Sequence, residues 1–572
     1  MNKRGQIAAI AIIIVLVIIV GILAYVYLIK PNISPAVKCG NGQCEKGEDA
    51  KNCASDCGGT KTNQTKPPID NKTNQTKPPV NNQTKPTSNQ TIELNQTTLS
   101  GNLSAYEDSP FGFTPSGVYS TPTTSTNGDF SFAHDIGVRW NRGMNYIFWD
   151  LVDPNSNGHY NFKIIGSNGA GNYDQEIKES VENLHLLENI ATFKPYTNID
   201  QNQAYINFVK AAVERYDGDD NLGCTIANPN PDCYVAGDNQ YPSQDLISLL
   251  RNNPVKYWQV GNMVGENNDF SDMQRATYNA VKSVDSGAKV LIGGDGGDYA
   301  TILDELNRQY IDIFDVHHFS NVTGGYLLDW GAIQPGNKLS YYRSLLDSNG
   351  YSNVPIWITE TGTYSGKADS AKDAYSLQTE QQQAGDYVKR YVYSLSRGVK
   401  KIFIAFGLME GYGEPENNDF WDNTGLIYDG QCYLECLDVW PNGIEPARGT
   451  KKLSYYSYQL MTQKLEGSDW NNIQIISGLP ANVYAYKFMK NGNPIYVVWW
   501  DYWTEASLSS KSATISVSGI TENARVTEAV PKYSSGQQVT NFATAFNTET
   551  KTVSDGQVSL TLGKNPVYIE QA

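Results

Sequence analysis

The sequence predicts an α/β protein in which a (β/α)8 TIM barrel is followed by an antiparallel β-sandwich. From residue 108 to 467, short apolar runs alternate with longer amphipathic runs, a pattern typical of a parallel sheet with helical crossovers. From 468 to 572, helical periodicity gives way to two-residue alternation with Gly and Asn between the runs, which favours antiparallel strands. An uncharged run of 23 residues, 7–29, adds a transmembrane helix ahead of both domains.

Length and charge exclude several classes of protein. At 572 residues the chain is too long for one compact domain, and its 40% hydrophobic content excludes a fully disordered protein. Lys plus Arg number 44 against 60 for Asp plus Glu, so the net charge is −16. A surface of that charge repels nucleic acid and anionic lipid, and no nucleic-acid partner is predicted.

Residues 1–30 are predicted to anchor the chain in the cell membrane. As a helix, 7–29 would rise about 34 Å, enough to cross a hydrocarbon core about 30 Å thick. Lys3 and Arg4 precede this run, so we expect a single-pass protein with its N-terminus in the cytoplasm and its bulk outside the cell. The start, Lys3-Arg4-Gly5-Gln6-Ile7, resembles the prepilin-like signals of archaeal surface proteins, which are cut before the apolar helix and leave it attached.

The eight cysteines fall in three local groups, as expected in an oxidising space outside the cell. Cys39, Cys44, Cys53 and Cys57 define a disulfide-rich module at 31–58. Acidic residues of this module could hold calcium, although their spacing does not follow the EF-hand pattern. Two further pairs are predicted to form local disulfides on loops at the barrel rim: Cys224 with Cys233, and Cys432 with Cys436.

Residues 59–107 are predicted to form an extended stalk. The segment holds near-repeats of Asn-Gln-Thr-Lys-Pro-Pro and too few apolar residues to bury a core. In polyproline II, at about 3.1 Å per residue, roughly 45 residues would span on the order of 100 Å. Asn-x-Ser/Thr sequons predict a glycoprotein if the organism glycosylates asparagine, and they begin at Asn63, Asn71, Asn74, Asn82, Asn89, Asn95 and Asn102.

The elements of the two folded domains are expected as follows. The barrel strands are predicted at 111–117, 135–140, 189–195, 255–260, 289–293, 313–319, 355–360 and 401–406. Helical patterns between them include 176–187, 204–216, 273–286, 339–346 and 374–396. The sandwich strands are predicted at 483–488, 494–500, 513–517, 558–562 and 567–570.

Polar residues follow several predicted barrel strands, at the end where the chemistry of such barrels is placed. Arg142 follows the second strand, Asn262 the fourth, His317-His318-Phe319 closes the sixth and Glu360 ends the seventh. The ordered phrases Lys256-Tyr-Trp-Gln-Val-Gly-Asn262 and Trp357-Ile-Thr-Glu360 resemble those of the clan A retaining glycoside hydrolases. The resemblance extends from about Phe111 to the end of the chain.

The resemblance implies a role for each of these residues. Glu360 matches the nucleophile of the family, and Asn262 matches the residue that binds the sugar 2-hydroxyl. His317 and Arg142 match positions that support the nucleophile and keep it ionised. The reaction needs a second carboxyl about 5 Å from the nucleophile, acting first as acid and then as base. No metal and no cofactor are implied, and the expected substrate is an extracellular polysaccharide or glycan.

Three positions depart from the family. The acid/base Glu expected directly after Asn262 is Met263, whose thioether neither gives nor takes a proton. The Tyr expected two residues after the His is Phe319, and the Trp expected at the end of the eighth strand is replaced by Ile404-Ala405-Phe406. Glu266, in the loop after Met263, is the candidate catalytic acid, and another carboxyl or a substrate group are the alternatives.

Two functions therefore stay open. The first is a retaining-type glycoside hydrolase at the cell surface, with Glu360 as nucleophile. The second is a catalytically impaired glycan-binding or adhesion protein on the same fold. In the second, Trp258, Trp421 and Trp440 would stack on sugar faces in the cleft.

Overall fold

The computed structural model describes residues 106–118, 128–143, 145–164, 172–219, 242–262, 269–294, 298–319, 338–366, 377–411, 420–430 and 446–572. All of them belong to one compact unit, Asn95–Ala572. The predicted anchor, the cysteine-rich module, nearly all of the stalk and all eight cysteines lie outside the described residues. Where the structure does describe the chain, its helices are too short or too polar to cross a membrane.

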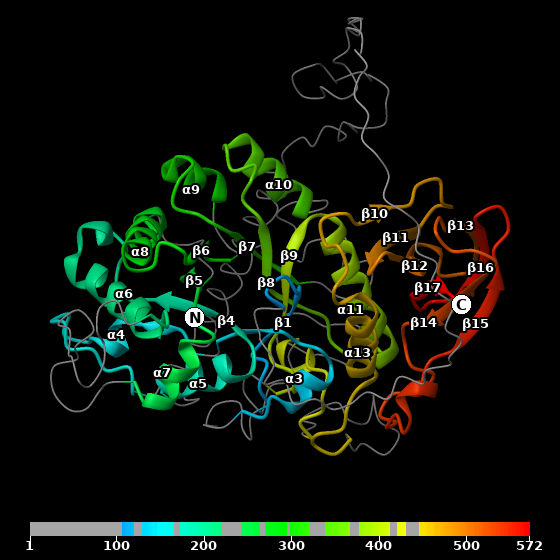
Figure 1. Cartoon of the computed structure of the whole chain (residues 1–572), viewed down its shortest axis with the longest axis horizontal. Coiled ribbons are helices and arrows are strands. Elements are labelled where there is room, and N and C mark those ends of the chain that lie inside the picture. The colour runs from blue at the N-terminus through cyan, green and yellow to red at the C-terminus, as the bar shows by residue number, and fades with distance from the viewer. Residues whose placement is uncertain are drawn as a thin grey trace, which may run out of the picture. The chain divides into compact units, whose positions relative to one another are not determined.

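Eight parallel strands within the described residues form the predicted barrel (Figure 1). Their bounds are β1 Phe111–Thr114, β2 Trp140–Arg142, β4 His185–Ala191, β5 Tyr257–Val260, β6 Lys289–Ile292, β7 Phe314–Phe319, β8 Ile356–Gly362 and β9 Val399–Ala405. They hydrogen-bond in the order β6-β5-β4-β2-β1-β9-β8-β7, and a short β3, Ile147–Phe148, pairs with β4. One parallel bridge, Leu291 with Ile313, joins the two ends of this order and closes the ring.

Two of the predicted strands are displaced along the chain. The second was expected at 135–140, but 131–135 form the short helix α3, Ser131–Asp135, and the strand begins at Trp140. The third was expected at 189–195 and lies at His185–Ala191, because the preceding helix ends at Asn183 rather than at 187. Leu184, Leu186 and Leu187 fit a helical pattern and a buried strand equally well, so periodicity did not separate the two.

Helices surround the barrel (Figure 1). They are α4 Trp149–Val152, α5 Tyr173–Asn183, α6 Gln203–Tyr216, α7 Gln244–Leu250, α8 Phe270–Val284, α9 Tyr299–Leu306, α10 Lys338–Ser348, α11 Glu380–Ser396 and α13 Leu453–Leu465. Side-chain caps fix several starts: Asn202 caps α6, and Thr379 with Gln382 forms a capping box on α11. The helices predicted at 204–216, 273–286, 339–346 and 374–396 are present as α6, α8, α10 and α11, with shifted ends.

Aromatic side chains fill the N-terminal half of the barrel. We call Trp140, Tyr257, Trp357 and Phe403 the aromatic layer; they pack with Leu187, Leu291 and Ile313. Trp140 lies 5.3 Å from Trp357 and 5.0 Å from Tyr257, measured between ring centroids. Lys401 places its Nζ 4.8 Å from the Trp140 ring centroid, and burial lowers the pKa of this lysine to about 8.

The C-terminal domain is antiparallel, as predicted. A six-stranded sheet has the order β10-β11-β12-β17-β14-β15, and β13 pairs with β16 in a two-stranded sheet. The bounds are β10 Gln474–Ile475, β11 Val483–Lys490, β12 Asn493–Trp500, β13 Lys511–Ser516, β14 Asn523–Glu528, β15 Thr548–Thr552, β16 Gln557–Leu562 and β17 Val567–Gln571.

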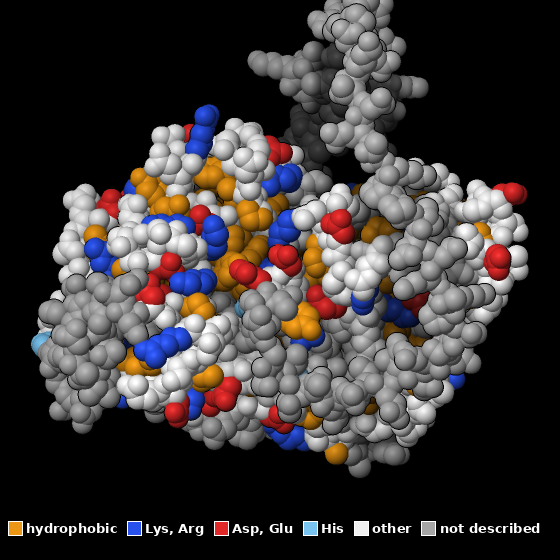
Figure 2. All heavy atoms as spheres, in the orientation of Figure 1, with side chains coloured by type: hydrophobic (Ala, Val, Ile, Leu, Met, Phe, Trp, Pro, Cys, Tyr) orange, Lys and Arg blue, Asp and Glu red, His pale blue; other side chains and the backbone are white. Residues whose placement is uncertain are grey.

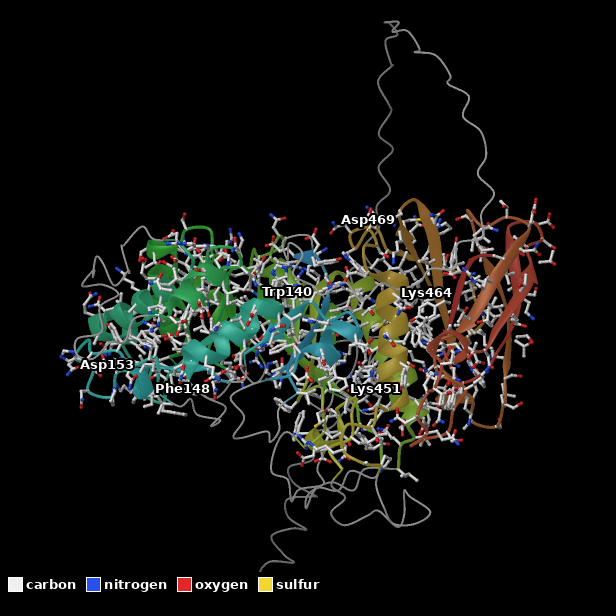
Figure 3. All side chains as sticks on the ribbon, turned by 60° about the horizontal axis from the view of Figure 1, so that its bottom comes forward. Trp140, Phe148, Asp153, Lys451, Lys464 and Asp469 are labelled. Carbon is white, nitrogen blue, oxygen red and sulfur yellow. The ribbon has the colours of Figure 1, made fainter. Side chains whose placement is uncertain are left out.

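Strand β12 is buried on both faces, which explains its unbroken apolar run. Val498 and Trp500 face the core shared with β13 and β16, whereas Val497 and Trp499 join the core that also holds Tyr391 of α11 and Tyr458 of α13. Figure 3 labels Trp140 in the barrel and Lys464 on α13, on the side of the β domain. Lys464 Nζ lies 2.6 Å from Glu570 of β17. On the face shown in Figure 2, acidic and basic side chains are interspersed.

Candidate active site

Arg142 connects three polar residues at the C-terminal ends of the barrel strands. Its Nη1 donates to Glu360 Oε1 at 2.6 Å, its Nη2 to Asn262 Oδ1 at 2.8 Å and its Nε to Gln259 Oε1 at 2.7 Å. Arg142 and Glu360 are almost completely buried, at 0% and 2% exposure. Strands β2, β5 and β8 thus bring one guanidinium onto a carboxylate and two amides, and charge-assisted bonds of this kind fix orientation strongly.

His317 lies on the other side of the same carboxylate. Its Nδ1 is 3.4 Å from Glu360 Oε2, and its Nε2 is 3.9 Å from Asp315 Oδ2. His317 and Asp315 are two residues apart on β7, so both point into the barrel. Glu360 is therefore held on one oxygen by Arg142 and faces an imidazole with the other.

Asp315 forms a second buried layer beneath Glu360. Gln259 Nε2 donates to Asp315 Oδ2 at 2.7 Å, and Thr359 donates to Asp315 through its backbone N at 3.2 Å and its Oγ1 at 2.8 Å. Because Gln259 also accepts from Arg142, one amide connects the guanidinium to Asp315. We call Arg142, Gln259, Asp315, His317, Thr359 and Glu360 the polar core of the barrel.

Burial dominates the electrostatics of the polar core. It raises the pKa of Asp315 to about 7 and raises the pKa of Glu360, while the Arg142 guanidinium opposes both shifts. Burial works against the charge of Arg142, but Tyr146, Glu360 and Asp315 together raise its pKa above the ordinary value. Tyr146 lies with its ring centroid 5.2 Å from the Arg142 guanidinium carbon, and burial raises the pKa of its phenol to about 12.

A glycine leaves room for the imidazole. Gly294 follows β6, and a Cβ placed there would lie 2.3 Å from His317 Nε2 and 2.7 Å from Asp315 Oδ2. Asn189 of β4 supports the neighbouring loop by donating from Nδ2 to the Gly261 carbonyl at 2.6 Å. The backbone beside Asn262 is therefore fixed from inside the barrel.

The structure brings four of the predicted site residues together and corrects a fifth. Arg142, Asn262, His317 and Glu360 are in contact, as the resemblance implied. Trp258, predicted to stack on sugars, is 0% exposed and packs in the core between barrel and helices. Along β5 the residues on either side of Trp258 point into the barrel, so Trp258 itself must point outward.

An apolar wall stands beside the polar core, and it contains two of the three positions at which the sequence differs from the pattern that it resembles. Phe319 and Phe406 stack at 6.4 Å between centroids, and Trp421 packs edge-on against them at 4.4 Å and 5.2 Å. Phe420 and Tyr364 complete this cluster. The Ala405–Phe406 peptide bond is cis. Phe319, found where the resemblance leads one to expect Tyr, thus contacts Phe406, which ends the segment found where Trp is expected, and both contact Trp421.

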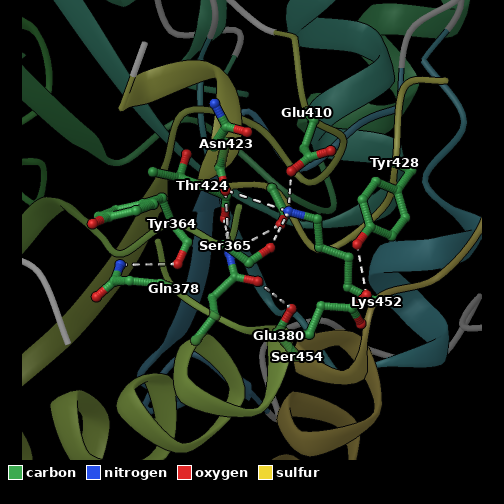
Figure 4. A network of polar contacts seen from close by, with 12 residues as sticks. Tyr364, Ser365, Gln378, Glu380, Glu410, Asn423, Thr424, Tyr428, Lys452 and Ser454 are labelled. Carbon is green, nitrogen blue, oxygen red and sulfur yellow. Dashed lines mark hydrogen bonds and ion pairs between the residues drawn. The ribbon is translucent and has the colours of Figure 1, made fainter. Parts of the chain in front are cut away.

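A buried polar network supports the loops behind this wall (Figure 4). Lys452, 0% exposed, forms an ion pair with Glu410 and donates to Ser365 Oγ at 2.9 Å. Glu380, the first residue of α11, accepts from Tyr428 Oη and from Leu453 N, both at 2.6 Å. The loops after β8 and β9 are therefore tied to the N-terminal ends of α11 and α13.

Several predicted positions lie outside the described residues. These are Met263, the candidate acid Glu266, Trp440 and the four loop cysteines Cys224, Cys233, Cys432 and Cys436. The sequence alone did not identify five residues that the structure places around the same carboxylate: Gln259, Asp315, Thr359, Tyr146 and Gly294. The alternation of β7 carried a signal for one of them, because Asp315 lies two positions before His317.

Known proteins were compared with the chain in sequence and in structure. No protein-family model matches the sequence, and no curated protein is detectably similar to it. A family 39 glycoside hydrolase from Bacteroides cellulosilyticus has a similar structure, with 14% identity, 77% of each chain covered and a TM-score of 0.47. A family 51 α-L-arabinofuranosidase from Bifidobacterium longum shows 11% identity and a TM-score of 0.48, covering 80% of this chain and 92% of its own.

A 4-O-α-L-rhamnosyl-β-D-glucuronidase from Fusarium oxysporum shows 12% identity and a TM-score of 0.44, with 82% and 96% covered. These structural neighbours are glycoside hydrolases. Identities and TM-scores this low do not assign an activity to the present chain, which has to follow from its own residues.

Proposed function

We propose that this protein is a cell-surface glycoside hydrolase that acts on extracellular polysaccharide or glycan by a retaining-type mechanism. The observation that carries the proposal is the buried Glu360 carboxylate, held by Arg142 and facing His317, with Asn262 bonded to the same guanidinium. This set lies at the C-terminal ends of the barrel strands, where barrel enzymes carry their chemistry.

Each group has a chemical task in this mechanism. Glu360 attacks the anomeric carbon and forms a glycosyl-enzyme ester, while the glycosidic oxygen leaves and takes up a proton. Arg142 and His317 orient the attacking carboxylate. Asn262 accepts from Arg142 through Oδ1, so its amide nitrogen is the donor for the sugar 2-hydroxyl, a bond that strengthens as positive charge develops at the anomeric carbon.

Protonation of the leaving group is the step for which the sequence lacks the residue that the family uses. Met263 cannot donate it, so the donor is Glu266, another carboxyl or a group of the substrate. A substrate whose leaving group departs without a proton bypasses this step. Dinitrophenyl glycosides should therefore form the glycosyl-enzyme on Glu360 whatever the natural acid is.

The experiment uses the full chain and a panel of dinitrophenyl glycosides. Mass spectrometry should find the sugar attached to Glu360, and azide, which attacks without a general base, should speed its release. Glu360→Gln should abolish labelling, whereas Glu549→Gln, on the exposed strand β15, should leave it unchanged. Met263→Glu should raise turnover of poor leaving groups by roughly 10²–10⁴-fold, the usual contribution of a general acid.

A second function is favoured by Met263 and by the apolar contacts of Phe319 with Phe406. On this alternative the chain binds glycans in the barrel mouth without cleaving them. Glycan binding without labelling of Glu360 by any activated glycoside would overturn the hydrolase proposal in favour of it. If natural glycosides are cleaved efficiently, a large loss in Glu266→Gln identifies Glu266 as the acid.

The cellular location is part of the proposal. Residues 1–30 hold the protein in the membrane, 59–107 raise the barrel above it, and the paired loop cysteines form disulfides outside the cell. Protease added to intact cells should release a soluble piece cut within the stalk. Recovery of the whole protein from the soluble cytoplasm, or four reduced thiols at Cys224, Cys233, Cys432 and Cys436, would contradict this arrangement.

A further inference from the structure

Three carboxylates gather at the C-terminal end of α6, apart from the polar core of the barrel. Glu214 lies in the last turn of the helix, Asp217 is its C-cap and Asp219 follows two residues later. One oxygen from each side chain lies within 4.8 Å of the other two. Glu214 and Asp217 are 4% and 1% exposed, while Asp219 is open to solvent. We call these three residues the α6 carboxylate cluster.

The end of helix α6 adds negative charge to the cluster. A helix C-terminus carries partial negative charge, so carboxylates placed there are repelled by the helix as well as by one another. Arg215, the basic residue in the last turn of α6, donates to both oxygens of Asp174 at 2.7 Å. Lys256, whose charge opposes the rise in the pKa of Asp217, lies 2.7 Å from Asp285. Both positive charges are thus engaged with other carboxylates.

A second observation points to a missing ligand. Asp217 Oδ1 accepts a hydrogen bond from Asp219 N at 3.2 Å, but Asp217 Oδ2 is buried and has no hydrogen-bond partner among the described residues. A buried carboxylate oxygen without a donor is costly, and the cost falls when a cation binds it. Burial, followed by the charges of Glu214 and Asp219, raises the pKa of Asp217 to about 8.

We propose that the α6 carboxylate cluster binds a calcium ion. The three side chains offer only oxygen, which hard cations prefer. Calcium accepts six to eight oxygen ligands in flexible geometry, whereas magnesium demands a near-ideal octahedron. Three carboxylates gathered within 4.8 Å of one another, with Asp219 open to water that can complete the set, therefore suit calcium better.

The role of a calcium ion bound at the α6 carboxylate cluster would be structural. Helix α6 packs against α8 on the outside of the barrel. The chain continues from the last turn of α6 toward α7. Calcium would join Glu214 within the helix to Asp219 beyond it. Its binding should stabilise the folded chain without altering the chemistry at Glu360, so the proposal stands whether or not the chain is a hydrolase.

The test is calcium binding by the full chain after treatment with a chelator. Titration calorimetry with calcium chloride should show a site with Kd on the order of 10⁻⁵–10⁻³ M, and the thermal midpoint should rise by roughly 5 °C at a hundredfold excess over Kd. Magnesium chloride should give a smaller rise. Asp217→Asn and Asp219→Asn should each lower the stoichiometry by one ion, whereas Asp304→Asn, on the exposed face of α9, should not.

The difference in stoichiometry between variants keeps the result separate from any calcium bound elsewhere in the chain. Asp219 is exposed, so Asp219→Asn should fold even if Asp217→Asn does not. Equal midpoints of the wild type in chelator and in about 10 mM calcium would overturn the proposal. So would a folded Asp219→Asn variant that binds as many ions, with the same affinity, as the wild type.

Discussion

The two halves of the barrel interior are built from the same strands but from opposite kinds of side chain. Toward the N-terminal ends, the aromatic layer packs ring against ring with aliphatic neighbours. Toward the C-terminal ends, the polar core joins one guanidinium, two carboxylates, an imidazole and an amide by hydrogen bonds and close contacts. Trp140 and Arg142, two residues apart on β2, belong to different halves.

The difference teaches how a closed barrel separates stability from chemistry. Side chains of the aromatic layer gain free energy by leaving water, and a well-packed interior resists changes of volume. The polar core loses solvation when it is buried, so its members persist only because each finds a partner. Substitutions in the two halves should therefore fail in different ways.

The largest contrast is expected between Arg142→Ala and Trp140→Ala. Each should lower the free energy of unfolding by roughly 3–5 kcal/mol, the first by leaving buried carboxylates without their cation and the second by leaving a cavity. Without Arg142, the pKa values of Glu360 and Asp315 in the folded protein should rise further above those of the unfolded chain than they do in the wild type. The wild-type carboxyls then ionise before those of Arg142→Ala, so the deficit of this variant should grow as the pH rises through the wild-type pKa values, about 7 for Asp315.

Urea unfolding at several pH values measures this contrast. Trp140→Ala should show a deficit that changes much less over the same range of pH, because it leaves the ion pair of Arg142 with Glu360 in place. Arg142→Lys, which keeps a positive charge, should recover part of the loss at neutral pH. Two deficits that follow the same course with pH would contradict the separation of the halves.

A second prediction concerns Asp315 alone. Its pKa is raised to about 7 in the folded chain, against about 3.9 when unfolded, so the stabilisation from its bound proton is complete below about pH 4 and is lost by about pH 7. Asp315→Asn cannot titrate. Relative to the wild type, this variant should gain stability as the pH rises through that window, by up to about 1.4 kcal/mol per pH unit.

The check is the unfolding midpoint of both proteins between pH 4 and pH 8. Thr359→Val removes a hydroxyl that donates to Asp315, so it should raise the pKa of this carboxyl and shift the fall in the free energy of unfolding toward higher pH. Identical slopes for wild type and Asp315→Asn would show that the carboxyl is already ionised across the window.

The smallest expected effects come from two glycines. In Gly294→Ala the new methyl meets His317 at 2.3 Å, and in Gly112→Ala it meets the Phe403 ring at 2.7 Å. Each should cost roughly 1–3 kcal/mol through overpacking. Only Gly294→Ala should also slow labelling of Glu360 by an activated glycoside, by on the order of 10²-fold, because it displaces the imidazole beside that carboxylate.

Labelling rates measured at equal folded fraction separate these two outcomes. A kinetic loss of similar size in Gly112→Ala would mean that strain in the aromatic layer reaches the mouth of the barrel. An unchanged rate in Gly294→Ala would remove His317 from the groups that position the nucleophile.

The sequence by itself determined the barrel and the proximity of four polar residues at one end of it. Regular alternation of short apolar and longer amphipathic runs sufficed for the barrel, because parallel strands need helical crossovers of that length. Arg142, Asn262, His317 and Glu360 could be placed together because they follow strands whose carboxyl ends meet at one end of any such barrel.

Only the tertiary structure decided which side of each strand faces the interior. Trp258 and Gln259 are neighbours on β5, but in the closed barrel the tryptophan points to the helices and the amide to Arg142. A strand buried on both faces shows no alternation of polarity, so its sequence does not show which of its residues point into the barrel. The burial of Asp315 beneath Glu360 has the same origin, since it depends on side chains from β5, β7 and β8 meeting across the closed ring.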